Sequence, residues 1–238
     1  MDVFELFGFG AKGWGGALLE AALMTLLVTL SALLIGAVFG SLVAWGKLSK
    51  SVPAKVAGDL YTTLFRCIPE LLVIYLIYFG GSSLMTAMHH SLGGEGFFGM
   101  PPFLSGAFAV GVISGSYQAE VYRGAFHAVS RGEIEAARAM GMPRLKLFFR
   151  IIMPQVMRFA LPGLGNVWQM TLKDSALISV TGLAEILRTS QVGASSTHQY
   201  FQFFIIGGVL YLVMTSISNR FFNAAEARVG KSFRRAIG

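Results

Sequence analysis

The sequence has few charges, one cysteine and no nucleotide-binding pattern. Charged residues make up 13% of its 238 residues, against roughly a quarter in a typical soluble domain. The single cysteine, Cys67, excludes an intramolecular disulfide, and the four scattered histidines lack the spacing of a metal site. The Walker A pattern G-x-x-x-x-G-K-[ST] does not occur. These absences argue against a soluble domain, a disulfide-stapled secreted fold, a zinc enzyme and a P-loop ATPase.

What the sequence has instead is a series of long apolar runs. Hydrophobic residues make up 54% of the chain, and no Asp, Glu, Lys or Arg occurs in 21–46, 71–94 or 96–119. About 20 apolar residues in a helix cross a hydrocarbon core of roughly 30 Å. We therefore predict an all-α polytopic membrane protein, a single transmembrane domain over 1–238, with five transmembrane helices near 18–45, 60–80, 102–124, 158–180 and 200–221.

The distribution of basic residues predicts how these helices are oriented. Fourteen of the nineteen lysines and arginines lie in one alternate set of connecting segments, which includes the C-terminal end, whereas the other set holds only Lys12 and Arg188. Positively charged segments stay in the cytoplasm. We therefore expect the N-terminus outside and the C-terminus in the cytoplasm.

The longest predicted cytoplasmic segment, near 127–158, has the pattern of a helix. Ser130 is a candidate N-cap, with Glu133 three residues later as in a capping box. Ile134 and Ala137 then fall on one face. Taken alone, this pattern is typical of an amphipathic helix that lies on a membrane surface.

The individual residues of this segment favour a more specific interpretation. They follow a fixed spacing, with Met153 where the pattern below has leucine: Glu135, Ala136, Ala137, Gly141, Ile151, Met153 and Pro154. This series resembles the cytoplasmic EAA loop of ABC importer permeases, EAA-x3-G-x9-I-x-L-P. The resemblance implies a short coupling helix that docks on the ATP-hydrolysing subunit. Two alanines would let it sit deep, Gly141 would end it, and Glu135 would face either the partner or its own helix N-terminus.

Three further stretches narrow the family. They read YTTLFRCIPELL at 61–72, SYQAEVYRG at 116–124 and KDSAL at 173–177. In this order they are similar to the "RGTPLL", "AYxAExxRG" and "KDSSL" stretches of polar amino-acid permeases. The whole chain looks closest to the Q-type membrane subunit of the histidine, arginine and opine importers.

The resemblance implies partner subunits, a location in a membrane, and ATP hydrolysis by a subunit other than this chain. It implies a type I ABC importer permease in the bacterial inner membrane, working with a dimer of ATP-binding subunits, a periplasmic solute-binding protein and a second permease subunit. An M-type heteromer is favoured, and a homodimer is the alternative. This chain would bind no cofactor and no nucleic acid, because ATP and Mg would be used by the partner ATPase. Its surroundings would be membrane lipid, and its substrate a small amino-acid-like molecule.

Charged residues inside the predicted spans need a partner or a function, because an ionised side chain at the bilayer centre costs about 2.5 to 3.5 kcal/mol on insertion scales. Arg66 and Glu70 are four residues apart, with Pro69 between them. On one helix they would share a face and could neutralise each other. Alternatively, Glu70 faces a central cavity and receives the cationic end of a substrate.

Two more charged pairs lie further along the chain. Glu120 and Arg123 are three apart near the cytoplasmic end of the third predicted span, and we favour an intrahelical or interhelical pair over a cavity role for Glu120. Lys173 and Asp174 are adjacent, hence about 100° apart around a helix. Since they match the "KDSSL" stretch, we interpret Arg123, Lys173 and Asp174 as structural or gating charges. The candidate substrate residues are Glu70, Arg66 and Glu120.

Small residues and one proline predict how the helices pack. Gly36 and Gly40 have the GxxxG spacing that allows close helix contact, and glycines such as Gly115 recur in the third span. Pro162 and Gly163 are predicted to break the fourth span where it lines a cavity.

The sequence therefore predicts a transport subunit and no enzyme. It would move a polar, basic amino acid or an opine from periplasm to cytoplasm. One alternative is an importer for glutamine- or glutamate-type amino acids. A second, from a different class, is a membrane channel or scaffold component that works without ATP.

Overall fold

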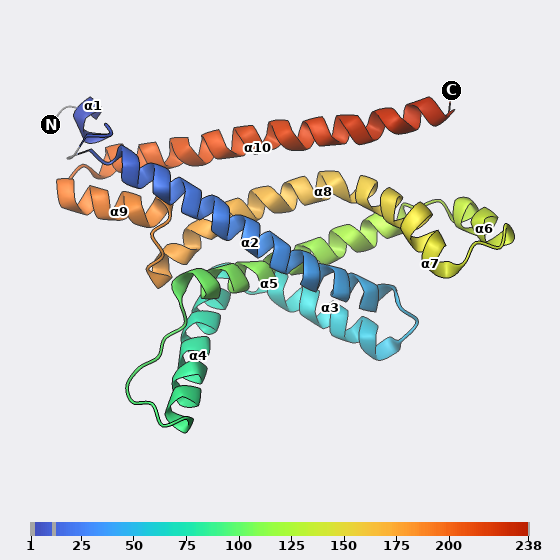
Figure 1. Cartoon of the computed structure of the whole chain (residues 1–238), viewed down its shortest axis with the longest axis horizontal. Helices are drawn as coiled ribbons and strands as arrows, with labels where there is room; N and C mark the ends of the chain where they lie inside the picture. The colour runs from blue at the N-terminus through green and yellow to red at the C-terminus, as the bar shows by residue number, and fades with distance from the viewer. Residues whose placement is uncertain (1–2, 11–12, 238) are drawn as a thin grey trace.

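The long helices form an elongated bundle. The computed structural model describes residues 3–10 and 13–237, with side chains for 5–10 and 13–229, so Lys12 and the side chains of the last basic residues lie outside the described part. All regular elements in that part are helical, which confirms the all-α prediction. Four helices run roughly along the long axis: α2 (Gly15–Leu48), α5 (Pro102–His127), α8 (Met153–Asp174) and α10 (Tyr200–Ile237) (Figure 1).

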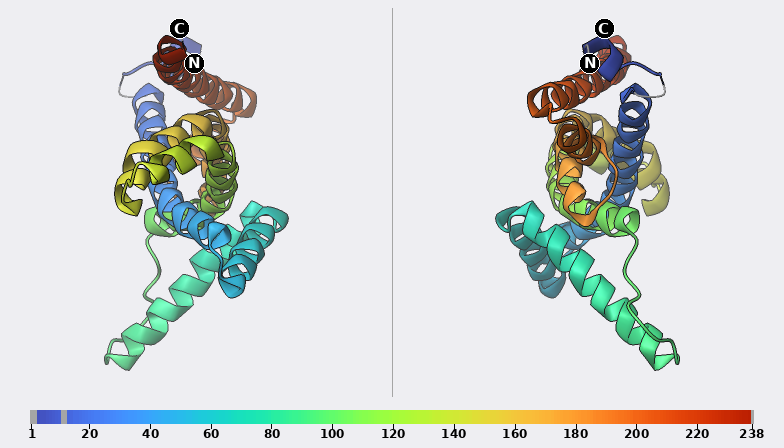
Figure 2. Two further views of the ribbon diagram at one scale, coloured as in Figure 1. Left: turned by 90° about the vertical axis from the view of Figure 1, so that its right-hand side faces the viewer. Right: turned by 90° about the vertical axis from the view of Figure 1, so that its left-hand side faces the viewer.

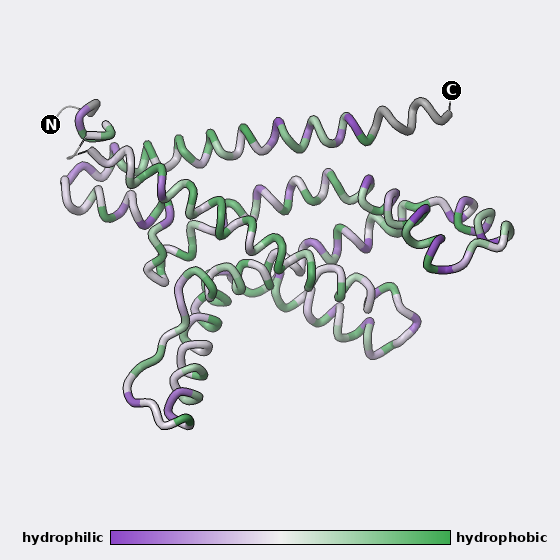
Figure 3. Tube along the Cα trace, viewed as in Figure 1, coloured by the Kyte–Doolittle hydropathy of each residue, from purple (hydrophilic) through white to green (hydrophobic). Residues whose placement is uncertain are grey.

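The other elements are shorter and lie at the ends or flanks of this bundle. They are α1 (Val3–Leu6), α3 (Val52–Cys67), α4 (Glu70–Ser91), α6 (Arg131–Ala139), α7 (Arg144–Leu147), the π-helix η1 (Phe148–Ile152), the 3-10 helix η2 (Ser175–Thr181) and α9 (Ile186–Thr197). Helix α9 lies at one end of the bundle, whereas α6 and α7 lie at the other (Figure 1). Hydrophilic residues gather around α6 and α7, while α2 is largely hydrophobic (Figure 3).

Four helical stretches of the described chain are long and apolar enough to cross a membrane: Gly15–Leu48, Glu70–Ser91, Arg144–Thr181 and Tyr200–Val229. Helix α5 matches the predicted third span in position, but its serines, glycines and Gln118 make it less apolar. It is the most completely buried helix, enclosed by α2, α3, α4 and α8, so it needs little lipid-facing apolar surface. The count of five spans stays a prediction.

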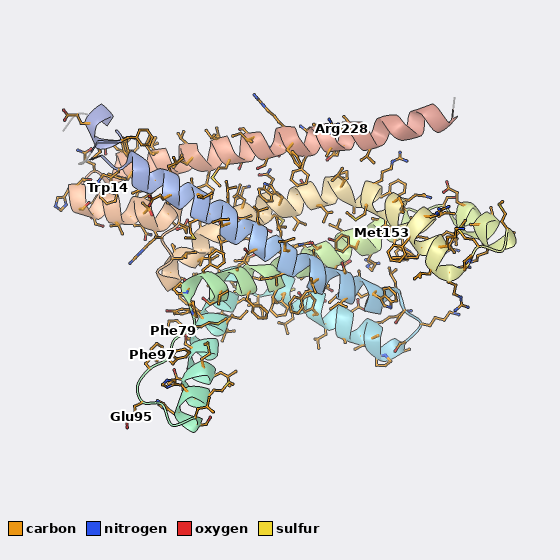
Figure 4. All side chains as sticks on the ribbon, in the orientation of Figure 1. Trp14, Phe79, Glu95, Phe97, Met153 and Arg228 are labelled. Carbon is orange, nitrogen blue, oxygen red and sulfur yellow. The ribbon has the colours of Figure 1, made fainter. Side chains whose placement is uncertain are left out.

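The predicted span 60–80 is wrong as a continuous helix. Helix α3 ends at Cys67 and α4 begins at Glu70, with Ile68 and Pro69 in extended conformations (ψ 137° and 131°). Proline disfavours helical geometry in the residue before it and donates no backbone hydrogen bond. After this break α4 turns away from the bundle (Figures 1 and 2). The loop that returns from α4 to α5 carries Glu95 and Phe97 (Figure 4).

The predicted close packing at glycines is confirmed. A Cβ added to Gly40 of α2 would lie 3.0 Å from the carbonyl oxygen of Gly115 in α5 and 2.9 Å from the Cβ of Gln118. A Cβ at Gly36 would lie 3.0 Å from the backbone nitrogen of Gly115. Backbone-to-backbone contact of this kind is possible only where side chains are absent.

The predicted break at Pro162 is wrong, because α8 continues through it. Proline removes one backbone hydrogen bond, but this 22-residue helix stays helical on both sides of Pro162. The helix instead tightens after Asp174 into η2, which ends at Gly182 in a left-handed conformation (φ 90°). The interruption therefore lies at Asp174, next to the break between α3 and α4.

Candidate functional site

Four polar side chains from four helices lie around the break between α3 and α4. Arg66 is at the end of α3, Glu70 at the start of α4, Tyr117 in α5 and Asp174 at the end of α8. The guanidinium carbon of Arg66 lies 5.5 Å from the ring centroid of Tyr117. Tyr117 interacts electrostatically with Glu70, Asp174 and Arg66, and Glu70 does so with Asp174. We call these four residues the helix-break cluster.

The ion pair between Arg66 and Glu70 that the sequence allowed is not formed. In the described part of the chain, recorded ion pairs join Lys47 to Asp59 and Glu120 and join Arg123 to Glu120, and neither Arg66 nor Glu70 takes part in them. Because the helix is broken between Arg66 and Glu70, their spacing of four residues does not place them on one face. Glu70 and Asp174, both half-buried, thus lie near each other and repel. A cation bound between them would offset this repulsion.

The start of α4 supplies backbone N–H groups beside the two carboxylates. The first N–H groups of a helix have no acceptor within it, and the aligned peptide dipoles make that end positive. At α4 the first backbone donors that bond within the turn are Leu72 and Val73, both to the carbonyl of Pro69. The cluster therefore offers carboxylates to a cationic group and amide N–H groups to a carboxylate. These are the charges that an amino acid carries, and discontinuous membrane helices bind substrates in this way.

The adjacent pair Lys173 and Asp174 points in two directions, as its spacing predicted. Asp174 is half-buried and belongs to the cluster, whereas Lys173 is exposed. The sequence interpretation placed Asp174 among structural charges. Its position next to Glu70 favours a role at the substrate.

Glu120 belongs to a separate charged network. Its Oε2 accepts hydrogen bonds from Nε and Nη2 of Arg123, at 3.0 and 2.8 Å, and its Oε1 accepts one from Nζ of Lys47. Lys47 Nζ also lies 2.8 Å from Oδ1 of Asp59 and 2.9 Å from Oγ1 of Thr62. The predicted intrahelical pair of Glu120 and Arg123 is therefore present. Both carboxylate oxygens of Glu120 are used, so we assign it to this network instead of the substrate site.

Sequence reasoning missed Lys47 and Asp59, because Lys47 was counted with the exposed cytoplasmic lysines. Its side chain is only 8% exposed and joins α2 to α3 and α5. Gly58 makes room for it, since a Cβ there would lie 2.5 Å from Cγ of Lys47. A lysine that ends a long apolar run, with an acidic residue twelve positions on, is too common a pattern to reveal such a network.

The helix predicted within 127–158 is formed, as α6. Gly141 adopts a left-handed conformation (φ 74°) just after it. The N–H of Gly141 donates to the carbonyl of Arg138, and the N–H of Met142 donates to that of Ala137. This is a Schellman motif, in which glycine ends a helix. Ser130 is the N-cap residue, but its side chain makes no capping hydrogen bond.

The two alanines of the EAA loop have different surroundings. Ala137 is 5% exposed and packs with Leu147 and Ile152 inside this chain, whereas Ala136 and Glu135 are exposed. Of these three EAA residues, Glu135 and Ala136 can therefore contact a partner directly, whereas Ala137 cannot. Ala137 instead packs α6 against α7 and η1.

A buried carboxylate at α9 was also missed. Glu185 is fully buried, and its two oxygens accept hydrogen bonds from the backbone N–H groups of Leu187, at 2.8 Å, and Arg188, at 2.7 Å. The hydroxyl of Tyr211 in α10 donates to it as well. Burial raises the pKa of the Glu185 carboxyl, although these three donors favour its charged form. The sequence pattern Leu-Ala-Glu is typical of many loops and gave no signal for this N-cap.

Known proteins with similar sequences belong to bacterial transport systems. Residues 36–231 match the model of a family described as binding-protein-dependent transport system inner membrane component. The chain is 51% identical to the octopine transport system permease protein OccQ of Rhizobium meliloti, with all of both chains covered. It is 38% identical to the histidine/lysine/arginine/ornithine transport system permease protein HisQ of Escherichia coli, covering 94% of this chain and 98% of the relative.

Solved structures show the same fold. A crystal structure of an amino acid ABC transporter with histidines matches with a TM-score of 0.76 and 32% identity, over 90% of this chain and 95% of that one. The methionine ABC transporter MetNI in an inward-facing conformation matches with a TM-score of 0.63 and 16% identity, over 89% and 97%. The second likeness concerns the fold alone.

Proposed function

The chain belongs to the family of inner membrane components of binding-protein-dependent transport systems, and we propose that it forms the membrane path through which an ABC importer takes up opines or basic amino acids. The family membership confirms the prediction of a multi-pass inner-membrane permease of the Q type. Such a permease is a transport component, and ATP hydrolysis lies in a separate subunit.

The helix-break cluster is the observation that supports this substrate class. Glu70 and Asp174 present two neighbouring carboxylates, and neither is part of an ion pair recorded among the described residues. Guanidinium and ammonium groups bind carboxylates by charge-assisted hydrogen bonds. The relatives that carry octopine, nopaline and basic amino acids in their names agree with this chemistry. A glutamate-type substrate would meet repulsion at the same place.

The proposal also assigns a direction and an energy source to the two ends of the bundle. We place the N-terminus in the periplasm and the C-terminus in the cytoplasm, so that α6 faces the ATPase. The exposed Glu135 and Ala136 would contact that subunit, and ATP with Mg would be bound there. The periplasmic solute-binding protein would dock at the opposite end, near α9.

The second permease subunit completes the assembly. We favour a heteromer with a related M-type chain, because the relatives carry Q-type names, and a homodimer is the alternative outcome. A channel or scaffold that works without ATP would need no coupling helix.

Affinity purification of the tagged chain from its native membrane, in mild detergent and followed by mass spectrometry, tests this assembly. We expect an ATPase and a second permease in amounts similar to the tagged chain. An ATPase without a second permease would establish a homodimer. Full recovery of the chain without any ATPase would contradict the proposed function and favour the channel or scaffold.

A further inference from the structure

Two hollows at the α9 end of the bundle share the side chains of Arg188 and Gln191. One, of about 630 Å³, lies between α9 and α10 and is also lined by Ser195 and Tyr200. The other, of about 440 Å³, lies between α9, η2 and α4 and includes Tyr75 and several residues of η2. Arg188 thus stands where polar groups from four elements converge.

The backbone at Arg188 is fixed while its side chain is available. Its N–H is held by the buried carboxylate of Glu185, which caps α9 and is itself bound by Tyr211. Its side chain is exposed and takes part in no ion pair recorded among the residues that the structure describes. A guanidinium on a rigid helix start presents a planar fork of donors, which suits a carboxylate.

The smaller hollow is bordered by α4 and by η2, the element that follows Asp174 of the helix-break cluster in the chain. Helix α4 and η2 contact each other, with Glu70 near Asp174 at one end of the contact and Tyr75 near Ser179 beyond it. Each step covers five residues, which is roughly 8 Å along an α-helix and about 10 Å along a 3-10 helix. Measured along α4 and η2, the residues that line the hollow thus lie roughly 8 to 10 Å from Glu70 and Asp174, about the length of a short, elongated molecule.

We propose that Arg188, with Gln191, binds the additional carboxylate of an opine whose cationic end lies at Glu70 and Asp174. This inference rests on the proposed function. An opine such as octopine carries the guanidinium of arginine and one carboxylate more than arginine does. The extra anionic group requires an extra cation in the permease, and Arg188 supplies it by a bidentate hydrogen bond.

Uptake of labelled octopine and labelled arginine by the complete importer in proteoliposomes tests this assignment. The variants are Arg188→Gln and Arg188→Lys, and Glu20→Gln is the control, because Glu20 is an exposed charge near the same end that lines neither hollow. We expect Arg188→Gln to lower octopine uptake about tenfold and arginine uptake less than twofold. Arg188→Lys should restore part of the octopine uptake, and Glu20→Gln should match the wild type.

The other outcomes separate this proposal from the one beneath it. An equal loss for both substrates would overturn the assignment and make Arg188 a docking residue for the solute-binding protein. Unchanged uptake of both would also overturn it. A wild-type importer that carries arginine but not octopine would overturn this proposal alone, whereas one that carries neither would overturn the proposed function as well.

Discussion

The guanidinium of Arg66 lies over the ring of Tyr117, 5.5 Å from its centroid, and Arg66 forms no ion pair with Glu70. A cation over an aromatic face is stabilised by the ring quadrupole. This contact joins the end of α3 to α5 and leaves the carboxylate of Glu70 to face Asp174. The break at Pro69 thus changes a pair that would be neutral on one helix into an acidic site.

Removing one carboxylate of this site should weaken the response to cationic substrates. For Glu70→Gln and for Asp174→Asn we expect substrate-stimulated ATP hydrolysis by the assembled importer to need roughly tenfold more loaded binding protein, or to fall by that factor. A hydrogen bond to a charged group contributes about 1.5 to 3 kcal/mol. The amount of protein in the membrane should stay the same. Glu95→Gln, on the exposed loop after α4 (Figure 4), is the matched control, and an equal fall for it would contradict the assignment.

The Lys47 network should stabilise the fold. Lys47→Met removes the cation that joins Glu120 to the exposed Asp59 and leaves Glu120 with Arg123 alone, which we expect to destabilise the fold by about 1 to 3 kcal/mol. We expect a lower midpoint of thermal unfolding in detergent, measured by tryptophan fluorescence. Lys50→Met, at an exposed position, should leave the midpoint within experimental error. The same midpoint for both variants would show that the network does not stabilise the fold.

Substitutions of the two alanines of α6 should impair the protein in different ways. Ala136→Arg changes an exposed side chain, so the protein should reach the membrane in normal amounts but bind the ATPase poorly in co-purification. Ala137→Arg places a long charged side chain against Leu147 and Ile152, so its amount in the membrane should fall. Normal ATPase binding by a well-expressed Ala136→Arg variant would show that α6 is not the coupling helix.

The contact between α2 and α5 should tolerate no side chain at Gly40. Gly40→Leu forces the two backbones apart at Gly115, and overpacking of this kind costs about 1 to 3 kcal/mol. We expect a lower unfolding midpoint and less protein in the membrane. Gly124→Ala is the control in α5, because a Cβ there meets no atom within 4 Å. Similar stability of both variants would mean that the helices can separate without loss.

The sequence predicts local features of this fold well and long-range ones poorly. Gly36 and Gly40 at helical spacing predicted a close helix contact, which the structure forms with α5, and Gly141 predicted the end of α6, because both features depend on short stretches of chain. The break at Pro69 was missed and one at Pro162 was expected. Both prolines interrupt an apolar run, and only packing against the neighbouring helices decides which one ends a helix.

The candidate site shows the same division. Glu70 was selected as a candidate because an ionised side chain within a predicted membrane span is costly unless it has a partner or a function. Its neighbour Asp174 is about one hundred residues away in the chain, and their proximity depends on how α4 packs against η2. Glu185 and Lys47 were missed for a similar reason, since their partners Tyr211 and Glu120 come from distant helices.

Uptake into proteoliposomes tests whether the chain forms the path of an ATP-driven importer. The chain is reconstituted with its co-purified partners, so that the ATPase faces the vesicle interior, where ATP or ADP is enclosed. The solute-binding protein and labelled arginine or octopine are added outside. We expect accumulation above the external concentration with ATP and none with ADP, and roughly tenfold or more reduced accumulation in Glu70→Gln. Entry that reaches only the external concentration and is equal with ATP and ADP would contradict this expectation and identify a channel.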